Sequence, residues 1–89
     1  MVQLVHEHAT QVRTPEGKTY VPRTYAEQQP DGTWFGWLEF RPLDDRLPTL
    51  RTERETTQPT LETVAYWASG LEPVYFEGAF ERARVVSAR

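Results

Sequence analysis

The segment from Leu50 to Pro59 carries the residue types best suited to holding an anion. It reads Leu-Arg-Thr-Glu-Arg-Glu-Thr-Thr-Gln-Pro, so it places two guanidinium groups beside several hydroxyls. Hydroxyl residues followed by proline are typical of a helix start, where free N–H groups and the helix dipole favour negative charge. Arginine adds paired donors for carboxylate or phosphate. The sequence therefore predicts that Arg51, Arg54 and Thr57 bind a phosphate, a nucleic-acid backbone or an acidic partner.

The same segment also allows a purely structural interpretation. Glu53 and Glu55 alternate with the arginines and are placed to neutralise them along or across a strand. In that interpretation the segment is a solvated edge strand with ion pairs, followed by a helix cap.

The aromatic segment 33–41 predicts a second kind of site. Successive side chains of a strand point to opposite faces. The two resulting sets are Trp34, Gly36, Leu38 and Phe40 on one face and Phe35, Trp37, Glu39 and Arg41 on the other. A single short helix covers only one face, and exposed aromatic patches are typical of interfaces. We therefore expect Tyr25, Phe35 and Trp37 to form a partner-binding surface. The alternative is burial under long side chains and the N-terminal hairpin.

Few other residues are suited to catalysis or metal binding. His6 and His8 point to the same side of a strand, but no sequence signal supplies a third ligand, so no metal site is predicted. Asp44 and Asp45 lie in a proline-bounded loop and are expected to form a turn rather than an acid–base pair. The chain has no nucleophile elbow and no phosphate-binding glycine loop. We therefore expect no catalytic residues, no cofactor and no enzymatic activity.

Length and composition narrow the class of protein. The chain has 89 residues, which predicts a single domain over 1–89, and it has no cysteine, which excludes disulfide scaffolds and zinc ribbons. The formal net charge of −3 disfavours non-specific nucleic-acid binding, which needs a cationic face. No apolar run approaches the roughly 20 residues of a membrane helix, and the N-terminus lacks a signal-peptide pattern. We therefore expect a cytoplasmic protein without a membrane partner.

Two turn signals organise the first half of the chain. Segments 14–18 and 29–33 each contain a proline followed two positions later by glycine, and both lie between runs of β-branched and aromatic residues. The sequence therefore predicts an N-terminal hairpin over 2–28 and central strands over 33–55. The individual strands are expected at 2–13, 18–28, 33–41 and 49–55. Pro22 cannot donate a ladder hydrogen bond, so its position should face an edge or a bulge.

The hydrophobic period changes in the second half. Apolar residues spaced at i, i+3, i+4 and i+7 from Leu61, with Gly70 behind them, predict a helix over 58–69. Alternating apolar residues from Val74 to Phe80 predict a C-terminal strand over 74–85, and a helical turn from Ala79 onward is the alternative. The expected fold is α+β, with an antiparallel sheet of four to five strands in the order β-β-β-β-α-β and one helix packed on one face.

The sequence Asp-Gly-Thr-Trp-Phe-Gly-Trp at 31–37, followed by a further strand, a capped helix near 57–69 and a last strand, resembles HicB-type antitoxin domains. The resemblance covers about residues 18–85. It implies this fold and the neutralisation of a partner protein. The chain departs from the family pattern at 43–48, which replaces a Pro-Gly-Cys-type segment, and it lacks the appended DNA-binding module of many members.

These patterns predict a non-enzymatic protein that acts by protein contact, as a homodimer through the aromatic sheet face or an edge strand. Anion or nucleic-acid binding at the junction of Arg51, Arg54 and Thr57 is one alternative, and antitoxin-like neutralisation is another. A small metal-dependent enzyme built on His6 and His8 is a third.

Overall fold

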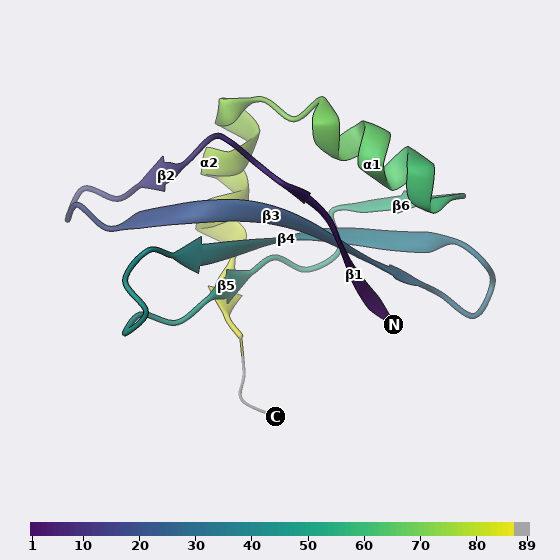
Figure 1. Cartoon of the computed structure of the whole chain (residues 1–89), viewed down its shortest axis with the longest axis horizontal. Coiled ribbons are helices and arrows are strands. Elements are labelled where there is room, and N and C mark those ends of the chain that lie inside the picture. The colour runs from purple at the N-terminus through teal and green to yellow at the C-terminus, as the bar shows by residue number, and fades with distance from the viewer. Residues whose placement is uncertain (87–89) are drawn as a thin grey trace.

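An antiparallel sheet with two helices on one side makes up the computed structural model of this protein, which describes residues 1–86 (Figure 1). The elements are β1 (Val2–Glu7), β2 (Val12–Arg13), β3 (Thr19–Gln28), β4 (Trp34–Pro42), β5 (Leu50–Arg51), β6 (Thr56–Gln58), α1 (Leu61–Ser69), α2 (Pro73–Arg82) and β7 (Arg84–Val85). The strand order is β1-β3-β4-β5-β7, with β2 beside β3 and β6 beside β4. The predicted α+β class and antiparallel sheet are confirmed.

Within the described residues the sheet has seven strands and there are two helices, whereas four to five strands and one helix were expected. Residues 87–89 of the predicted single domain lie outside the described part.

Both predicted hairpin turns form around a glycine with positive φ. Gly17 has φ 88° and Gly32 has φ 90°, a conformation that glycine adopts without steric cost. At the second turn the Asp31 carboxylate accepts hydrogen bonds from the backbone N–H of Thr33, at 3.0 Å, and from its hydroxyl, at 2.7 Å. The turn joins β3 and β4, the longest pair of strands, which stay in register from Tyr20 opposite Pro42 to Gln28 opposite Trp34.

Pro22 explains why the expected strand 2–13 is divided into β1 and β2. Its carbonyl accepts a hydrogen bond from the backbone N–H of His8 at 3.0 Å, so this side of Pro22 faces the first segment of the chain. Because proline has no N–H to offer there, ladder pairing stops after Glu7 and resumes at Val12. A register shift between Leu4 and His6 adds a bulge to β1. Pro22 was predicted to face an edge or a bulge, and it lies opposite the break between β1 and β2 instead.

Helix α1 begins at Leu61, three residues later than expected. Thr60 is the N-cap, and it forms a reciprocal capping pair with Thr63, so Pro59 precedes the cap instead of occupying the first turn. The helix buries Val64 and Ala68 against the sheet and ends at Gly70, as predicted.

Residues 74–82 form a helix, so the predicted strand over 74–85 is wrong for most of its length. Pro73 occupies the first turn of α2, which its fixed φ favours, and only Arg84 and Val85 pair as the short strand β7. Phe76 and Ala79 are buried at helical spacing, whereas Val74, which alternates with Phe76, is 71% exposed. The alternation was misleading because Phe76 and Phe80, which are four residues apart, lie on one face of a helix and would also lie on one face of a strand. The alternative of a helical segment was right, but the helix starts six residues earlier than Ala79.

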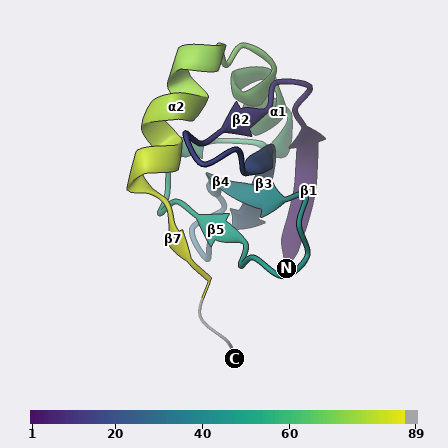
Figure 2. The same cartoon turned by 90° about the vertical axis from the view of Figure 1, so that its left-hand side faces the viewer.

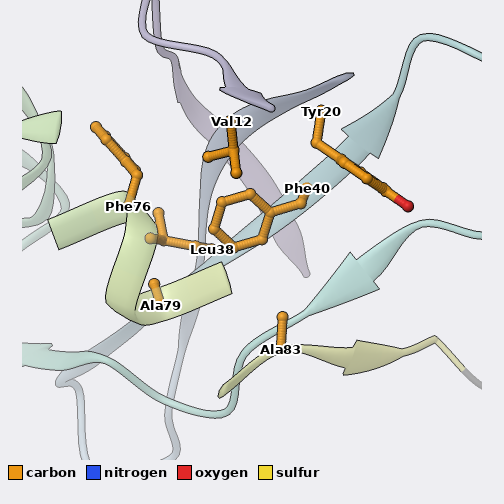
Figure 3. Packing of buried hydrophobic residues seen from close by; sticks show 7 residues of the cluster. All are labelled: Val12, Tyr20, Leu38, Phe40, Phe76, Ala79 and Ala83. Atoms are coloured by element: carbon orange, nitrogen blue, oxygen red, sulfur yellow. The ribbon is translucent and has the colours of Figure 1, made fainter. Parts of the chain in front are cut away.

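The second helix completes the hydrophobic core. Figure 3 shows sheet residues meeting the side chains of α2 and of the residue that follows it. The buried members are Val12, Tyr20, Leu38, Phe40, Phe76, Ala79 and Ala83. Phe80 closes one side of this core, with its ring 5.2 Å from Phe40 and 4.9 Å from Tyr20.

Both helices lie on the same side of the sheet. In Figure 2 they stand above strands that run from β1 at the right to β5 and β7 at the lower left. Even-numbered residues of β3 and β4 point to the helices, and odd-numbered residues point away from them. Within residues 1–86 no helix covers the odd-numbered side. None of the described helices is long and apolar enough to cross a membrane.

Candidate functional site

The sheet side opposite the helices is the candidate site, and we call it the open face. It consists of the odd-numbered side chains of β3 and β4 together with the side chains of neighbouring strands that pair with them. The register places Leu4, Tyr25 and Trp37 in one row across β1, β3 and β4. The rings of Tyr25 and Trp37 are stacked, with centroids 6.4 Å apart and planes 18° from parallel. The three residues predicted for partner binding, Tyr25, Phe35 and Trp37, therefore lie on one surface.

Trp37 is only 3% exposed although none of the helices within residues 1–86 covers it. The guanidinium of Arg51 lies 4.3 Å from the centroid of the Trp37 ring, and the indole N–H donates a hydrogen bond to the Glu39 carboxylate at 3.2 Å. Covering by long side chains was the alternative that the sequence left open, and it holds for this residue. Trp37 is thus a buried support of the open face, whereas Tyr25 and Phe35 are half-buried.

A second guanidinium, that of Arg54, lies against the ring of Phe35. The Arg54 guanidinium carbon lies 4.9 Å from the centroid of the Phe35 ring. Thr57 pairs with Phe35 across β6 and β4, so its exposed side chain belongs to the same face. The two sites predicted separately, one aromatic and one cationic, are therefore a single surface.

The helix N-terminus takes no part in this surface, which corrects one element of the predicted anion site. Thr57 lies in β6 rather than at a cap, and the first turn of α1 is already satisfied by Thr60 and Thr63. An anion at the arginines is therefore held by side chains and not by the helix dipole.

Glu55, which was expected to neutralise the arginines, faces the helices instead. Its carboxylate accepts hydrogen bonds from the Tyr75 hydroxyl and from Arg82, the latter at 2.5 Å. Burial, together with this hydrogen bond to Glu55, raises the pKa of Tyr75 to about 12. Among residues 1–86, Arg51 and Arg54 form no ion pair within 4.0 Å, so both guanidinium groups keep donors for an external acceptor.

A hollow of about 450 Å³ lies beside these arginines on the open face. Its lining residues are Phe35, Arg51, Thr52, Glu53, Arg54, Arg84, Val85 and Val86. Arg84 was not predicted, because it is distant in the sequence and enters only through the pairing of β7 with β5. Its Nη1 donates to the backbone carbonyls of Glu81, Arg82 and Ala83 at 3.0–3.3 Å, which fixes the guanidinium at the end of α2.

The opposite edge of the sheet is the exposed strand β1. Among the described residues it pairs only with β3, so its outer edge is open. Val2 and Leu4 are 49% and 52% exposed, and Leu4 adjoins Tyr25 on the open face. A second hollow, of about 280 Å³, lies between β1 and α1.

The two histidines form a pair without further ligands. Their ring centroids are 4.5 Å apart, but no group of three or more potential metal ligands occurs within residues 1–86. His8 is buried against Phe76, and its Nε2 lies 2.7 Å from the hydroxyl of Thr24. Burial, with a smaller effect of His6, lowers the pKa of His8 to about 4. His8 is thus a core residue, although a histidine near the chain end is usually exposed or half-exposed.

Asp44 forms a local turn, as expected for the loop after β4. Its carboxylate accepts hydrogen bonds from the backbone and the guanidinium of Arg46, and these bonds lower its pKa.

Comparison of the chain with protein families, curated proteins and solved structures finds no match. The HicB-like resemblance therefore stays a prediction.

Proposed function

We propose that this chain is a non-enzymatic cytoplasmic protein that acts by protein contact, and that it pairs with a second copy through β1 and the adjoining part of the open face. The observation that carries the proposal is the row of Leu4, Tyr25 and Trp37. It joins an open strand edge to an aromatic surface that neither helix of the described residues covers.

The chemistry of β1 suits a second copy of the same strand. Open edges pair readily with other strands, and proteins that avoid such pairing usually place lysine or proline on them. The sequence of β1, Val-Gln-Leu-Val-His-Glu, contains neither, and its bulge lies after Leu4, so Val2–Leu4 is the regular part of the edge. Two copies of β1 running antiparallel are self-complementary, as a twofold interface requires. Such pairing would bring the exposed Val2 and Leu4 side chains of both copies together and remove their apolar surface from water.

The two predicted contact rings and their support have different roles in this interface. Tyr25 lies next to Leu4 and contributes its half-buried ring to the contact. Trp37 acts by holding Tyr25 and Arg51 in place, since it is itself buried. Phe35 extends the surface toward the other end of β4.

Sedimentation equilibrium at tens of micromolar tests the proposal. We expect the wild-type chain to show twice the mass of the monomer and Leu4→Lys to show the monomer mass, because the substitution puts a charge in the centre of the paired edge. Val74→Lys is the matched control, since it places the same charge on an exposed apolar position of α2.

Two results would contradict the proposal. One is a wild-type chain that remains monomeric at this concentration. The other is a dimer that Leu4→Lys leaves intact while circular dichroism shows the variant to be folded.

A further inference from the structure

The hollow on the open face gathers three arginines around a partly apolar floor. Arg51 comes from β5, Arg54 from the segment between β5 and β6, and Arg84 from β7. Phe35, Val85 and Val86 supply the apolar part of the lining. Arg51 lies on Trp37 and Arg54 on Phe35, so stacking restrains both guanidinium planes while their N–H groups stay available.

The pairing of β5 with β7 places two of these arginines opposite each other in the sheet. Arg51 and Arg84 are direct cross-strand partners, and like charges in that position destabilise a sheet. Glu39, opposite Arg51 on the other side, accepts the Trp37 indole hydrogen bond and makes no ion pair with Arg51 within 4.0 Å. Only Nη1 of Arg84 is taken up by the carbonyls at the end of α2, so its other N–H groups are left for an anion, and a bound anion in the hollow would reduce the repulsion between the two positive charges.

We propose that this hollow binds a phosphate monoester on a small organic group. Three arginines and Glu53 give the lining a net charge of +2, and a phosphate monoester carries about −1.5 to −2 at pH 7. Guanidinium groups match phosphate oxygens in paired hydrogen bonds. The apolar residues beside them offer contact for the organic part, and the hollow is large enough for both.

The hollow shares Phe35 and Arg51 with the open face, but it lies far from β1, the strand proposed to pair with a second copy. The strand order places β1 at one end of the sheet and β5 with β7 at the other. Leu4→Lys should therefore leave phosphate binding unchanged, and the two proposals can fail independently.

Isothermal titration of the full chain with inorganic phosphate, phenyl phosphate and a nucleoside 5′-monophosphate tests the site at low ionic strength. We expect saturable binding of one ligand per chain, weaker for inorganic phosphate than for the two esters. Arg54→Gln should weaken binding about tenfold, because a hydrogen bond to a charged group is lost. Arg41→Gln is the matched control, since Arg41 is exposed on the same face but outside the hollow.

Three results would overturn the site. The first is the absence of any heat of binding, and of any change in the amide NMR signals of the protein, with all three ligands at millimolar concentration. The second is an equal loss of affinity in Arg41→Gln and Arg54→Gln, which would mark general charge attraction. The third is retention of full affinity in both Arg54→Gln and Arg84→Gln with thermal melts showing that the variants are folded.

Discussion

Trp37 is covered by the guanidinium of Arg51 and not by apolar side chains of a helix. Arg51 removes the ring from water while its charge stays at the surface, and such a contact contributes about 0.5–2 kcal/mol. The sequence predicted the aromatic residues and the arginines as two independent sites. The two sites meet because β4 pairs with both β5 and β6, and these two strands are too short for the sequence to reveal their pairing.

His8 leads to a prediction for the pH dependence of stability. Its pKa is about 4 in the folded protein and about 6.5 in an unfolded chain. The unfolded state therefore takes up a proton between these values while the folded state does not. We expect the free energy of unfolding to be nearly constant above about pH 7.5 and to fall by about 3 kcal/mol as the pH drops to 4, since the pKa difference is about 2.5 units and one unit corresponds to about 1.4 kcal/mol. Urea denaturation at a series of pH values measures this change in the free energy of unfolding.

Two variants assign this pH dependence to His8. His8→Gln should remove most of the slope between pH 6.5 and 4, whereas His6→Gln should keep most of it, because burial rather than the neighbouring His6 is the main cause of the lowered pKa. An unchanged slope in His8→Gln would show that other groups are responsible.

At the scale of elements, those that depend on neighbouring residues were predictable from the sequence, and those that depend on long-range packing were not. The two hairpins follow from proline and glycine within five residues, and the helix face of α1 follows from its own period. Helix α2 was missed because its apolar residues Val74, Phe76 and Phe80 alternate in the sequence, and only the packing of Phe76 and Ala79 with Leu38 and Phe40 shows the helical period. Arg84 was missed with it, since its place at the hollow depends on the end of α2 and the pairing of β7.

Gly36 controls how closely α1 approaches the sheet. A Cβ at this position would lie 2.9 Å from Thr56 Cγ2 and 3.1 Å from Val64 Cγ1, which is too close for either methyl group. Gly36→Ala should therefore lower the free energy of unfolding by about 1–3 kcal/mol, the usual cost of overpacking. Gly70→Ala is the control, because a Cβ there meets only ordinary contacts at 3.8–4.0 Å. Equal melting temperatures for the two variants would contradict this packing argument.

At the scale of the whole molecule, the helix side of the sheet and the hollow on the open face carry opposite net charge. The helices and the residue preceding α2 carry Glu62, Glu72, Glu77 and Glu81 against the one arginine Arg82. The hollow on the opposite side has a net charge of +2 within a chain whose formal net charge is −3. Net charge alone therefore underestimated the capacity of one face to attract anions.

The most direct test of the central claim, that β1 pairs with a second copy, is amide hydrogen exchange of β1 at two protein concentrations. Residues Val2–Glu7 form an open edge in the single chain, so their outward-facing amides should exchange rapidly at low micromolar concentration. We expect these amides to become protected at hundreds of micromolar, while the amides of β4 stay equally protected at both concentrations. Exchange of β1 that is rapid and identical at the two concentrations would contradict the account.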